Sequence, residues 1–114
     1  MHEVAIAEGI FNIIEKERQQ HHFTAVTDIE LVCGKYNCVS EEHLAFCFDL
    51  ITKETYIDGA TLKVTRVPEL CTCMDCNKEF EKEDALLVVC PFCGSGNVRE
   101  KANYDIYLKS LEVE

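Results

Sequence analysis

Proline, glycine and tryptophan are scarce in this sequence. Its 114 residues include 2 prolines, 5 glycines and no tryptophan, while hydrophobic residues make up 47%. This composition excludes a disordered or collagen-like chain and is typical of a globular fold. A chain of this length buries roughly 60–70% of the surface that its unfolded state exposes, which suffices for one modest core. We therefore expect order nearly throughout, and a second folded unit would depend on something other than an apolar core.

Basic residues and long hydrophobic runs are also few. The sequence has 11 Lys and Arg against 21 Asp and Glu, a formal net charge of −10. Because contacts with phosphates need a surplus of positive charge, this balance disfavours DNA or RNA binding. The apolar stretch near the N-terminus is interrupted by Glu8 and follows Glu3 with no basic residue before it. We therefore expect neither a signal peptide nor a membrane span there, and a cytoplasmic protein.

The spacing of apolar residues predicts two helices, one over residues 4–20 and one beginning after Ser40. In the first, the apolar positions at helical spacing are Ile6, Ile10, Ile13 and Ile14. In the second, they are Leu44, Cys47, Phe48 and Ile51. Ser40 is a typical N-cap residue, and acidic residues follow it in the first turn.

Three further segments have strand character, at residues 26–33, 62–67 and 104–113. In the last one the apolar positions change face, which predicts a bulge near Ser110. We expect this strand to pair with residues 62–67, so that the cysteine-rich segment leaves and returns at the end of a hairpin. The predicted fold class is α+β, with two helices packed on a small three-stranded sheet in residues 1–69 plus 99–114, and an inserted four-cysteine, zinc-ribbon-like domain in residues 70–98.

The strongest motif is a pair of CxxC sequences. Cys73-Met-Asp-Cys76 and Cys90-Pro-Phe-Cys93 lie 13 residues apart in a chain with eight cysteines. Cytoplasmic cysteines are kept reduced, so this clustering indicates a metal site before disulfides. Two such turns can present four thiolates tetrahedrally to one Zn²⁺, and a site closed in this way leaves no position for water or substrate. We therefore expect a structural zinc ion.

Two residues suit the tight turns that such a site needs. Asn77 and Gly94 follow the two CxxC pairs, and both residue types tolerate a positive φ. Phe80 and a strand-like segment at residues 85–89 supply apolar material to the small unit. This is too little to fold without metal.

The other cysteines leave alternatives open. Cys71 provides a fifth thiol beside the first pair, so a ligand set that includes it is an alternative, and iron in the same cage is another. Cys33 and Cys47 fall on apolar faces and are expected in the core. Cys38 falls in a predicted turn, where we expect it to be exposed.

His2 gains interest from its position in the chain. An isolated histidine is more often a surface or structural residue. Near a free terminus, however, the Met1 amine, the His2 imidazole and the amide nitrogens between them can chelate one divalent ion, because few bonds separate these donors. Nitrogen donors in a plane suit Ni²⁺ or Cu²⁺.

Together these features resemble the HypA/HybF family of hydrogenase nickel-incorporation proteins. The resemblance runs the full length and rests on the opening Met-His-Glu-Val-Ala-Ile-Ala-Glu-Gly, the paired CxxC motifs and the closing Leu-Glu-Val-Glu. It implies a nickel metallochaperone that serves [NiFe]-hydrogenase maturation, supplying the large subunit together with a HypB-type GTPase. It also implies nickel ligands at His2, Glu3 and Met1. His2 would bind through its imidazole and its main-chain nitrogen, Glu3 through its main-chain nitrogen, and Met1 through its amine. The zinc ligands it implies are Cys73, Cys76, Cys90 and Cys93.

The sequence departs from the family pattern in two places. Some relatives add a carboxylate ligand at the start of the second helix, where this chain has Ser40 with Glu41 and Glu42 beside it. Residues 103–105, Asn-Tyr-Asp, replace the Gly-x-Glu-Leu often found before the last strand. The first departure concerns the nickel ligand set, and the second concerns local geometry.

Parts of this sequence pattern are also compatible with other functions. A zinc-stabilised protein-interaction module without a specific nickel site shares the same cysteines. An enzyme is not expected, since no nucleophile, base and open metal position occur together. His21, His22 and His43 are candidates for a second metal site, although solvated histidines are the simpler interpretation. We expect a monomer or a weak homodimer.

Overall fold

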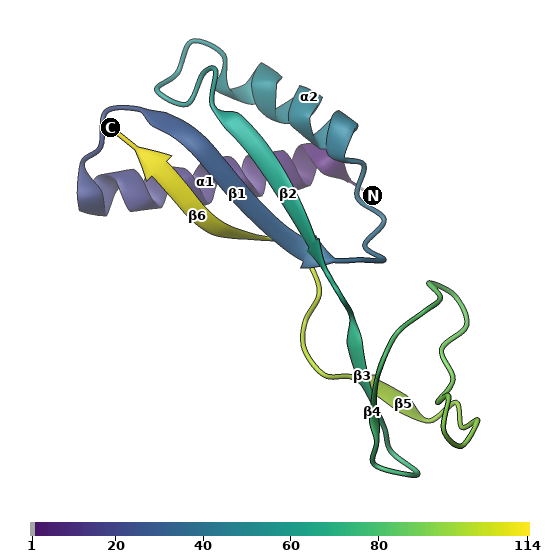
Figure 1. Cartoon of the computed structure of the whole chain (residues 1–114). Helices are drawn as coiled ribbons and strands as arrows, with labels where there is room; N and C mark the ends of the chain where they lie inside the picture. The colour runs from purple at the N-terminus through teal and green to yellow at the C-terminus, as the bar shows by residue number, and fades with distance from the viewer. Residues whose placement is uncertain (1) are drawn as a thin grey trace. The chain divides into compact units, whose positions relative to one another are not determined.

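The computed structural model describes residues 2–114 (Figure 1). Its elements in chain order are α1 (Glu3–His21), β1 (Val26–Gly34), α2 (Glu41–Thr52), β2 (Thr61–Val67), β3 (Leu70–Cys73), β4 (Glu79–Glu81), β5 (Val98–Glu100) and β6 (Tyr107–Val113). They form two compact units. The first contains the described residues up to Val32, Cys38–Thr65 and Tyr107–Glu114, and the second contains Cys33–Asn37 and Arg66–Ile106. No helix within residues 2–114 has the length and apolarity to cross a membrane.

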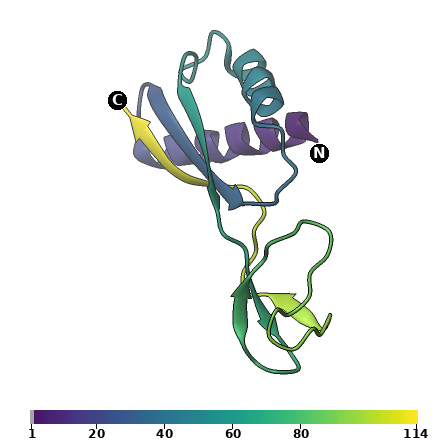
Figure 2. The ribbon, with the colours of Figure 1, turned by 45° about the vertical axis from the view of Figure 1, so that its right-hand side comes forward.

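The first unit is a three-stranded sheet with two helices. The strand order is β2-β1-β6, and α1 crosses the sheet and packs against α2 (Figures 1 and 2). The sheet and the two helices share one apolar core, in which the largest fully buried side chains include Ile14, Leu31 and Leu44. The predicted α+β class, with two helices on a small sheet, is confirmed.

Both helices begin and end close to the predicted residues. α1 starts at Glu3 and is closed by His22, whose left-handed conformation (φ 51°) lets its amide donate to the Arg18 carbonyl. The predicted cap of α2 is confirmed, because Ser40 Oγ accepts the amide of His43 at 3.3 Å. The expected apolar stripe of α1 is wrong at Ile13, which is exposed.

The predicted neighbour of the last strand is wrong. β6 pairs antiparallel with β1, which separates it from β2. The reason is that β1 is the most buried strand of the sheet and therefore takes the central place, while β2 and β6 are half exposed at the edges. The predicted bulge is confirmed, since the register skips Lys109 between Ser110 and Leu108. The strand begins at Tyr107, later than the predicted residue 104.

The second unit contains a smaller antiparallel sheet of order β4-β3-β5 (Figure 2). The predicted strand at residues 85–89 is wrong, because these residues form a loop outside the sheet. Asp84 explains the difference. Its carboxylate accepts the amides of Leu86 at 2.7 Å and Leu87 at 3.2 Å. These hydrogen bonds to a nearby side chain take the place of the backbone hydrogen bonds that a strand would make.

Candidate metal centres

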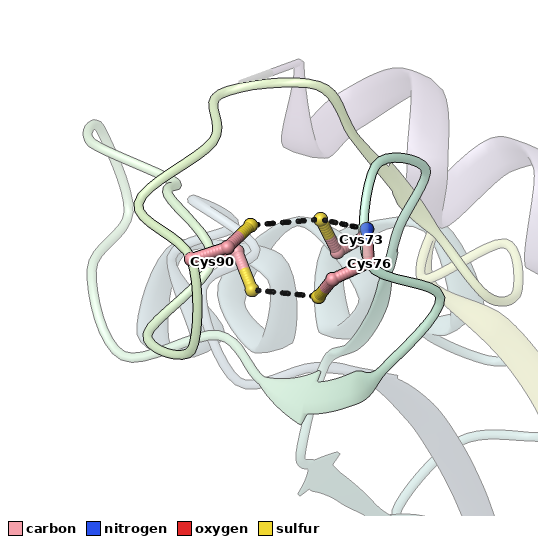
Figure 3. A group of neighbouring side chains, drawn as sticks. Cys73, Cys76 and Cys90 are labelled. Carbon is pink, nitrogen blue, oxygen red and sulfur yellow. Dashed lines mark hydrogen bonds between the residues drawn. The ribbon is translucent and has the colours of Figure 1, made fainter.

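The two CxxC pairs sit in two similar turns of the second unit (Figure 3). After the first pair, Asn77 has φ 63° and donates its amide to the Cys73 carbonyl at 2.9 Å. After the second, Gly94 has φ 76° and donates to the Cys90 carbonyl at 2.8 Å. The prediction that these two residues take a positive φ is confirmed. Each turn thereby folds back on itself and presents both of its sulfurs on one side.

The four sulfurs have the separations of a metal cage. Cys73 and Cys93 Sγ lie 3.6 Å apart, as do Cys76 and Cys90 Sγ, and all four atoms lie within 4.8 Å of one another. A tetrahedron with Zn–S bonds of about 2.3 Å has sulfurs about 3.8 Å apart, whereas a disulfide needs about 2.05 Å. The donor set therefore fits one tetrahedral ion and not two disulfides.

Backbone amides also point at the sulfurs. The amide of Cys76 donates to Cys73 Sγ, and that of Phe92 donates to Cys90 Sγ, both at 3.4 Å. Desolvation raises the pKa of the Cys90 thiol. Hydrogen bonds from the amides of Phe92 and Cys93 and from the neighbouring thiols outweigh this effect and lower the pKa to about 7. The site thus favours a first thiolate at Cys90 near neutral pH.

A fourth thiolate is costly in the same cage. The Ser95 amide lowers the pKa of Cys93, yet hydrogen bonding with Cys73, desolvation and the other thiols outweigh it and raise this pKa to about 12. Four thiolates this close repel one another unless a cation lies between them. A divalent ion supplies that charge, so ion binding and release of the thiol protons are coupled.

The remaining cysteines lie outside this cage. In the part of the chain that the structure describes, the only group of three or more potential ligands is Cys73, Cys76, Cys90 and Cys93. The geometry therefore favours this set over one with Cys71, whose thiol is buried in β3 and has its pKa raised by that burial. Cys33 and Cys47 are buried and Cys38 is exposed, as predicted.

The second candidate centre lies at the start of α1, in the first unit. Met1 falls outside the described residues. His2 occupies the N-cap position, its carbonyl accepts the amide of Ile6 at 3.1 Å, and its side chain is exposed and makes no capping hydrogen bond. The amide nitrogens of His2 and Glu3 precede this first helical bond and need no helical acceptor. An ion can engage them without breaking the helix.

The side chain of Glu3 connects the start of α1 to the start of α2. Its side chain is only 6% exposed, Oε2 accepts the amide of Ser40 at 3.0 Å, and Oε1 lies 3.3 Å from Nδ1 of His43. The Ser40 amide is the main cause that holds the pKa of Glu3 below its usual range. The sequence gives no signal for this contact, because the two partners are 37 residues apart.

The predicted second metal site is not assembled from histidines among the described residues. His21 lies beside Glu17, with Nε2 and Oε2 3.5 Å apart, and His22 is the cap of α1. Neither belongs to a group of three potential ligands within residues 2–114. His43 faces Glu3 instead.

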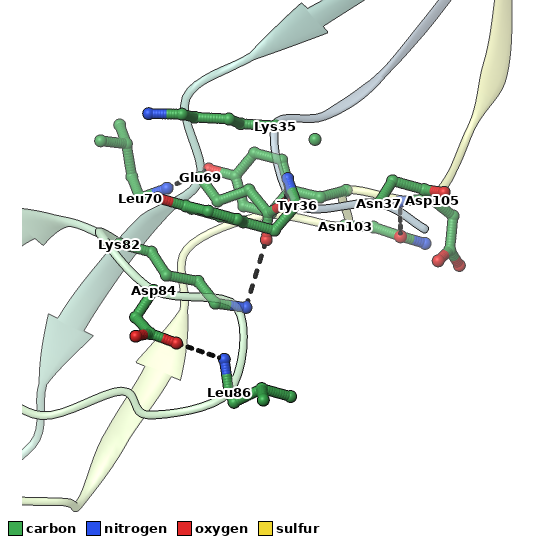
Figure 4. A network of polar contacts seen from close by, with 12 residues as sticks. Lys35, Tyr36, Asn37, Glu69, Leu70, Lys82, Asp84, Leu86, Asn103 and Asp105 are labelled. Atoms are coloured by element: carbon green, nitrogen blue, oxygen red, sulfur yellow. Dashed lines mark hydrogen bonds and ion pairs between the residues drawn. The ribbon is translucent and has the colours of Figure 1, made fainter. Parts of the chain in front are cut away.

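A buried polar network also stabilises the second unit (Figure 4). Glu69 is nearly fully buried, and its Oε2 accepts the amide of Tyr36 at 2.7 Å while its Oε1 lies 3.5 Å from Lys82 Nζ. Gly34 lies against the same carboxylate, and its amide donates to the Tyr104 carbonyl at 3.0 Å. Sequence patterns missed this network because its members come from four separate segments.

These features define a small α+β protein with a group of four cysteines that fits one metal ion and a helix that begins at Glu3. The sequence matches, over residues 1–113, the family described as "Hydrogenase/urease nickel incorporation, metallochaperone, hypA". The chain belongs to this HypA family, as the resemblance at the level of sequence motifs indicated.

Individual relatives agree with this assignment. A hydrogenase maturation factor HybF from Morganella morganii is 36% identical over 114 residues, covering 100% of both chains. A hydrogenase maturation factor HypA from Paracoccus denitrificans is 32% identical over 113 residues, covering 99% of both. The solution structure of the Ni metallochaperone HypA from Helicobacter pylori matches 99% of this chain and 97% of its own, with a TM-score of 0.73 at 20% identity. At that identity the structural match supports the fold.

Proposed function

We propose that this protein is a nickel metallochaperone. It binds Ni²⁺ at its N-terminus and delivers it during maturation of [NiFe]-hydrogenase, while a structural Zn²⁺ is held by Cys73, Cys76, Cys90 and Cys93. The observation that carries the proposal is the arrangement at the start of α1. There the side chain of His2 is exposed and makes no capping hydrogen bond, and the next residue, Glu3, is buried and accepts the Ser40 amide.

The nickel site uses the donors that precede the first helical hydrogen bond. The His2 imidazole and the main-chain nitrogens of His2 and Glu3 coordinate the ion, together with the Met1 amine. The Glu3 carboxylate is already engaged by Ser40 and His43, so Glu3 contributes its nitrogen and its side chain holds the segment in position. An open site of this kind releases its ion more readily than a closed cage, which suits delivery.

Zinc has a different role. The four-thiolate cage has no open position, so its ion organises the second unit and takes no part in chemistry. Nickel binding belongs to residues 1–69 plus 99–114, and zinc binding belongs to residues 70–98. No catalytic step is needed for the proposed role, and we assign none.

The partners follow from family membership. A HypB-type GTPase and the [NiFe]-hydrogenase large subunit are the proposed partners, in the cytoplasm, with the protein acting as a monomer or weak homodimer. The alternative is a zinc-stabilised interaction module in which His2 has no role. The two differ only in whether the N-terminus binds nickel.

Calorimetric titration with Ni²⁺ tests this difference. Untagged, zinc-loaded protein is compared with His2→Ala and, as matched control, with His21→Ala, which removes an exposed histidine from the other end of α1. We expect one nickel per chain in the wild type and in His21→Ala, and none at the same site in His2→Ala. Elemental analysis should find one zinc in all three.

Equal nickel binding by His2→Ala and the wild type would overturn the carrier and leave the interaction module. Because an imidazole must be neutral to coordinate, nickel binding should also weaken as the pH falls. A wild-type affinity that does not change between pH 8 and pH 5 would contradict an imidazole ligand.

A further inference from the structure

A groove in the second unit has no part in the proposed nickel or zinc sites. It lies beside the loop that joins the two cysteine pairs and has a volume of about 220 Å³. Its lining includes three apolar side chains and three carboxylates, from Phe80, Leu87, Val89, Glu81, Glu83 and Asp84. We call these six residues the acidic groove.

The loop that forms the acidic groove is folded, although it belongs to no strand. Asp84 Oδ1 accepts the amide of Leu86, as Figure 4 shows, and it also accepts the amide of Leu87. The same two bonds lower the pKa of Asp84, so the carboxylate is charged at neutral pH. This local bonding presents Leu86 and Leu87 to solvent, with 95% and 69% of their surfaces exposed.

Only part of the negative charge of the groove is offset by a neighbour, through the electrostatic effect of Lys82 on Asp84. Lys82 is the only basic residue between positions 79 and 89, and its ammonium group lies against buried Glu69 (Figure 4). Within the described part of the chain, neither Glu81 nor Glu83 has an ion-pair partner. The groove therefore combines exposed apolar surface with two carboxylates that have no ion-pair partner, so a ligand with both apolar and basic groups complements it.

The volume and the charge of the acidic groove limit the kinds of ligand that it can bind. Small-molecule sites usually measure about 300–1,000 Å³, so this groove is suited to a single side chain and not to a whole cofactor. Carboxylates repel the phosphates of nucleic acids and of anionic lipids. A second copy of this chain also has a net charge of −10, which opposes its approach.

We propose that the acidic groove docks a segment of a partner protein in which a lysine or arginine is flanked by apolar residues. The aliphatic stem of the basic side chain packs on Leu87 and Val89, and its charged end meets Glu81 and Glu83. Long basic side chains have this dual character, and arginine is enriched at interfaces. Charge complementarity also speeds association. This docking site is independent of nickel binding.

A short peptide provides the test. Zinc-loaded, ¹⁵N-labelled full-length protein is titrated with an acetylated pentapeptide of alternating leucine and arginine, and separately with the same peptide carrying glutamate for arginine. We expect amide shifts concentrated at residues 80–91 with the first peptide and none with the second. Glu81→Gln combined with Glu83→Gln should weaken binding about tenfold, through the loss of two charge pairs.

Matched controls separate docking from general attraction to an acidic protein. Leu87→Ser, inside the groove, should weaken binding, whereas Leu86→Ser, a residue outside the lining, should not. Shifts scattered over the first unit, or equal weakening by Glu17→Gln combined with Glu112→Gln, would overturn the proposal. Groove shifts that grow with protein concentration in the absence of peptide would assign the surface to a second copy and overturn it as well. Zinc content per chain verifies that each variant is folded.

Discussion

The two units reach a defined structure by different means. The first buries side chains such as Ile14, Leu31 and Phe48 between helices and sheet. The second buries cysteines, while apolar residues of its long loop, Leu86 and Leu87, remain exposed. Burial of apolar surface stabilises the first unit, whereas the second has a polar network around buried Glu69 and a group of four cysteines that fits one ion.

This difference suits a carrier. The proposed nickel site lies on the unit whose fold needs no metal, so cargo can bind and leave without a folding transition. The group of four cysteines lies on the other unit, and we propose that its ion stays in place because the fold of that unit depends on it. In this proposal the transported metal and the resident metal are held by different units.

Removal of zinc is expected to have the largest effect. Zinc binding in comparable small units is worth about 10–16 kcal/mol, so chelation should unfold the second unit and leave the first folded. NMR amide shifts measured before and after a strong chelator is added will show this. If the shifts of residues 70–101 stay dispersed in metal-free protein, the comparison between the units is wrong.

Truncating the apolar core should have the next largest effect, on the other unit. Phe48→Ala should lower the free energy of unfolding of the first unit by about 3–5 kcal/mol, because the side chain is 2% exposed. Phe46→Ala is the matched control on the same helix: its side chain is 61% exposed, and the change should stay within about 0.5 kcal/mol.

Urea unfolding followed by helical circular dichroism measures both variants. Zinc content should be unchanged in each, because the core of the first unit and the thiolate cage belong to different units. Loss of zinc in Phe48→Ala would show that the two units fold as one.

Removing the cap of α2 should have a smaller effect. Ser40→Ala deletes the Oγ that accepts the His43 amide, which should lower the stability of the first unit by about 1 kcal/mol. Ser40→Thr keeps a hydroxyl acceptor and should recover most of the loss. The urea unfolding midpoints of the wild type, Ser40→Ala and Ser40→Thr test this prediction. Equal midpoints for Ser40→Ala and Ser40→Thr would exclude capping as the cause of the lost stability.

The smallest effect expected is a pH dependence that comes from Glu3. Its pKa is lower in the folded state, mainly because of the Ser40 amide, so its stabilising contribution is present above the unfolded pKa and is lost as the pH falls through the folded value. Glu3→Gln should therefore reduce the difference in stability between pH 6 and pH 3. Hydrogen exchange of the Leu44 amide measures the first unit alone, and an unchanged difference would rule out Glu3 as the source.

Local patterns predicted the two helices, the three strands of the first sheet and the grouping of the four CxxC cysteines, but they missed β3, β4 and β5. The helix caps and the positive φ values of Asn77 and Gly94 depend on residues close in sequence, so they can be inferred from spacing. The four cysteines are positioned by those same turns. The class of fold followed from the number and periodicity of the elements.

Long-range features could not be predicted in the same way. The pairing of β6 with β1 depends on which strand is most buried, a property that no single segment carries. The contact of Glu3 with Ser40 and His43 depends on how α1 packs against α2. Residues 85–89 have β-branched and apolar side chains, but the carboxylate of Asp84 selected a loop.

Gly34 links two distant segments of the chain, because both of them occupy the space that a side chain at this position would need. A Cβ at this position would lie 2.7 Å from both Glu69 Cδ and Tyr104 Cβ, closer than real Cβ atoms approach their neighbours. Glu69→Asp would remove only the first of these clashes, because the Cβ of Tyr104 stays where it is. Position 34 is therefore held as glycine by two separate segments of the chain, and an alanine there needs the carboxylate to shorten and the Tyr104 backbone to shift together.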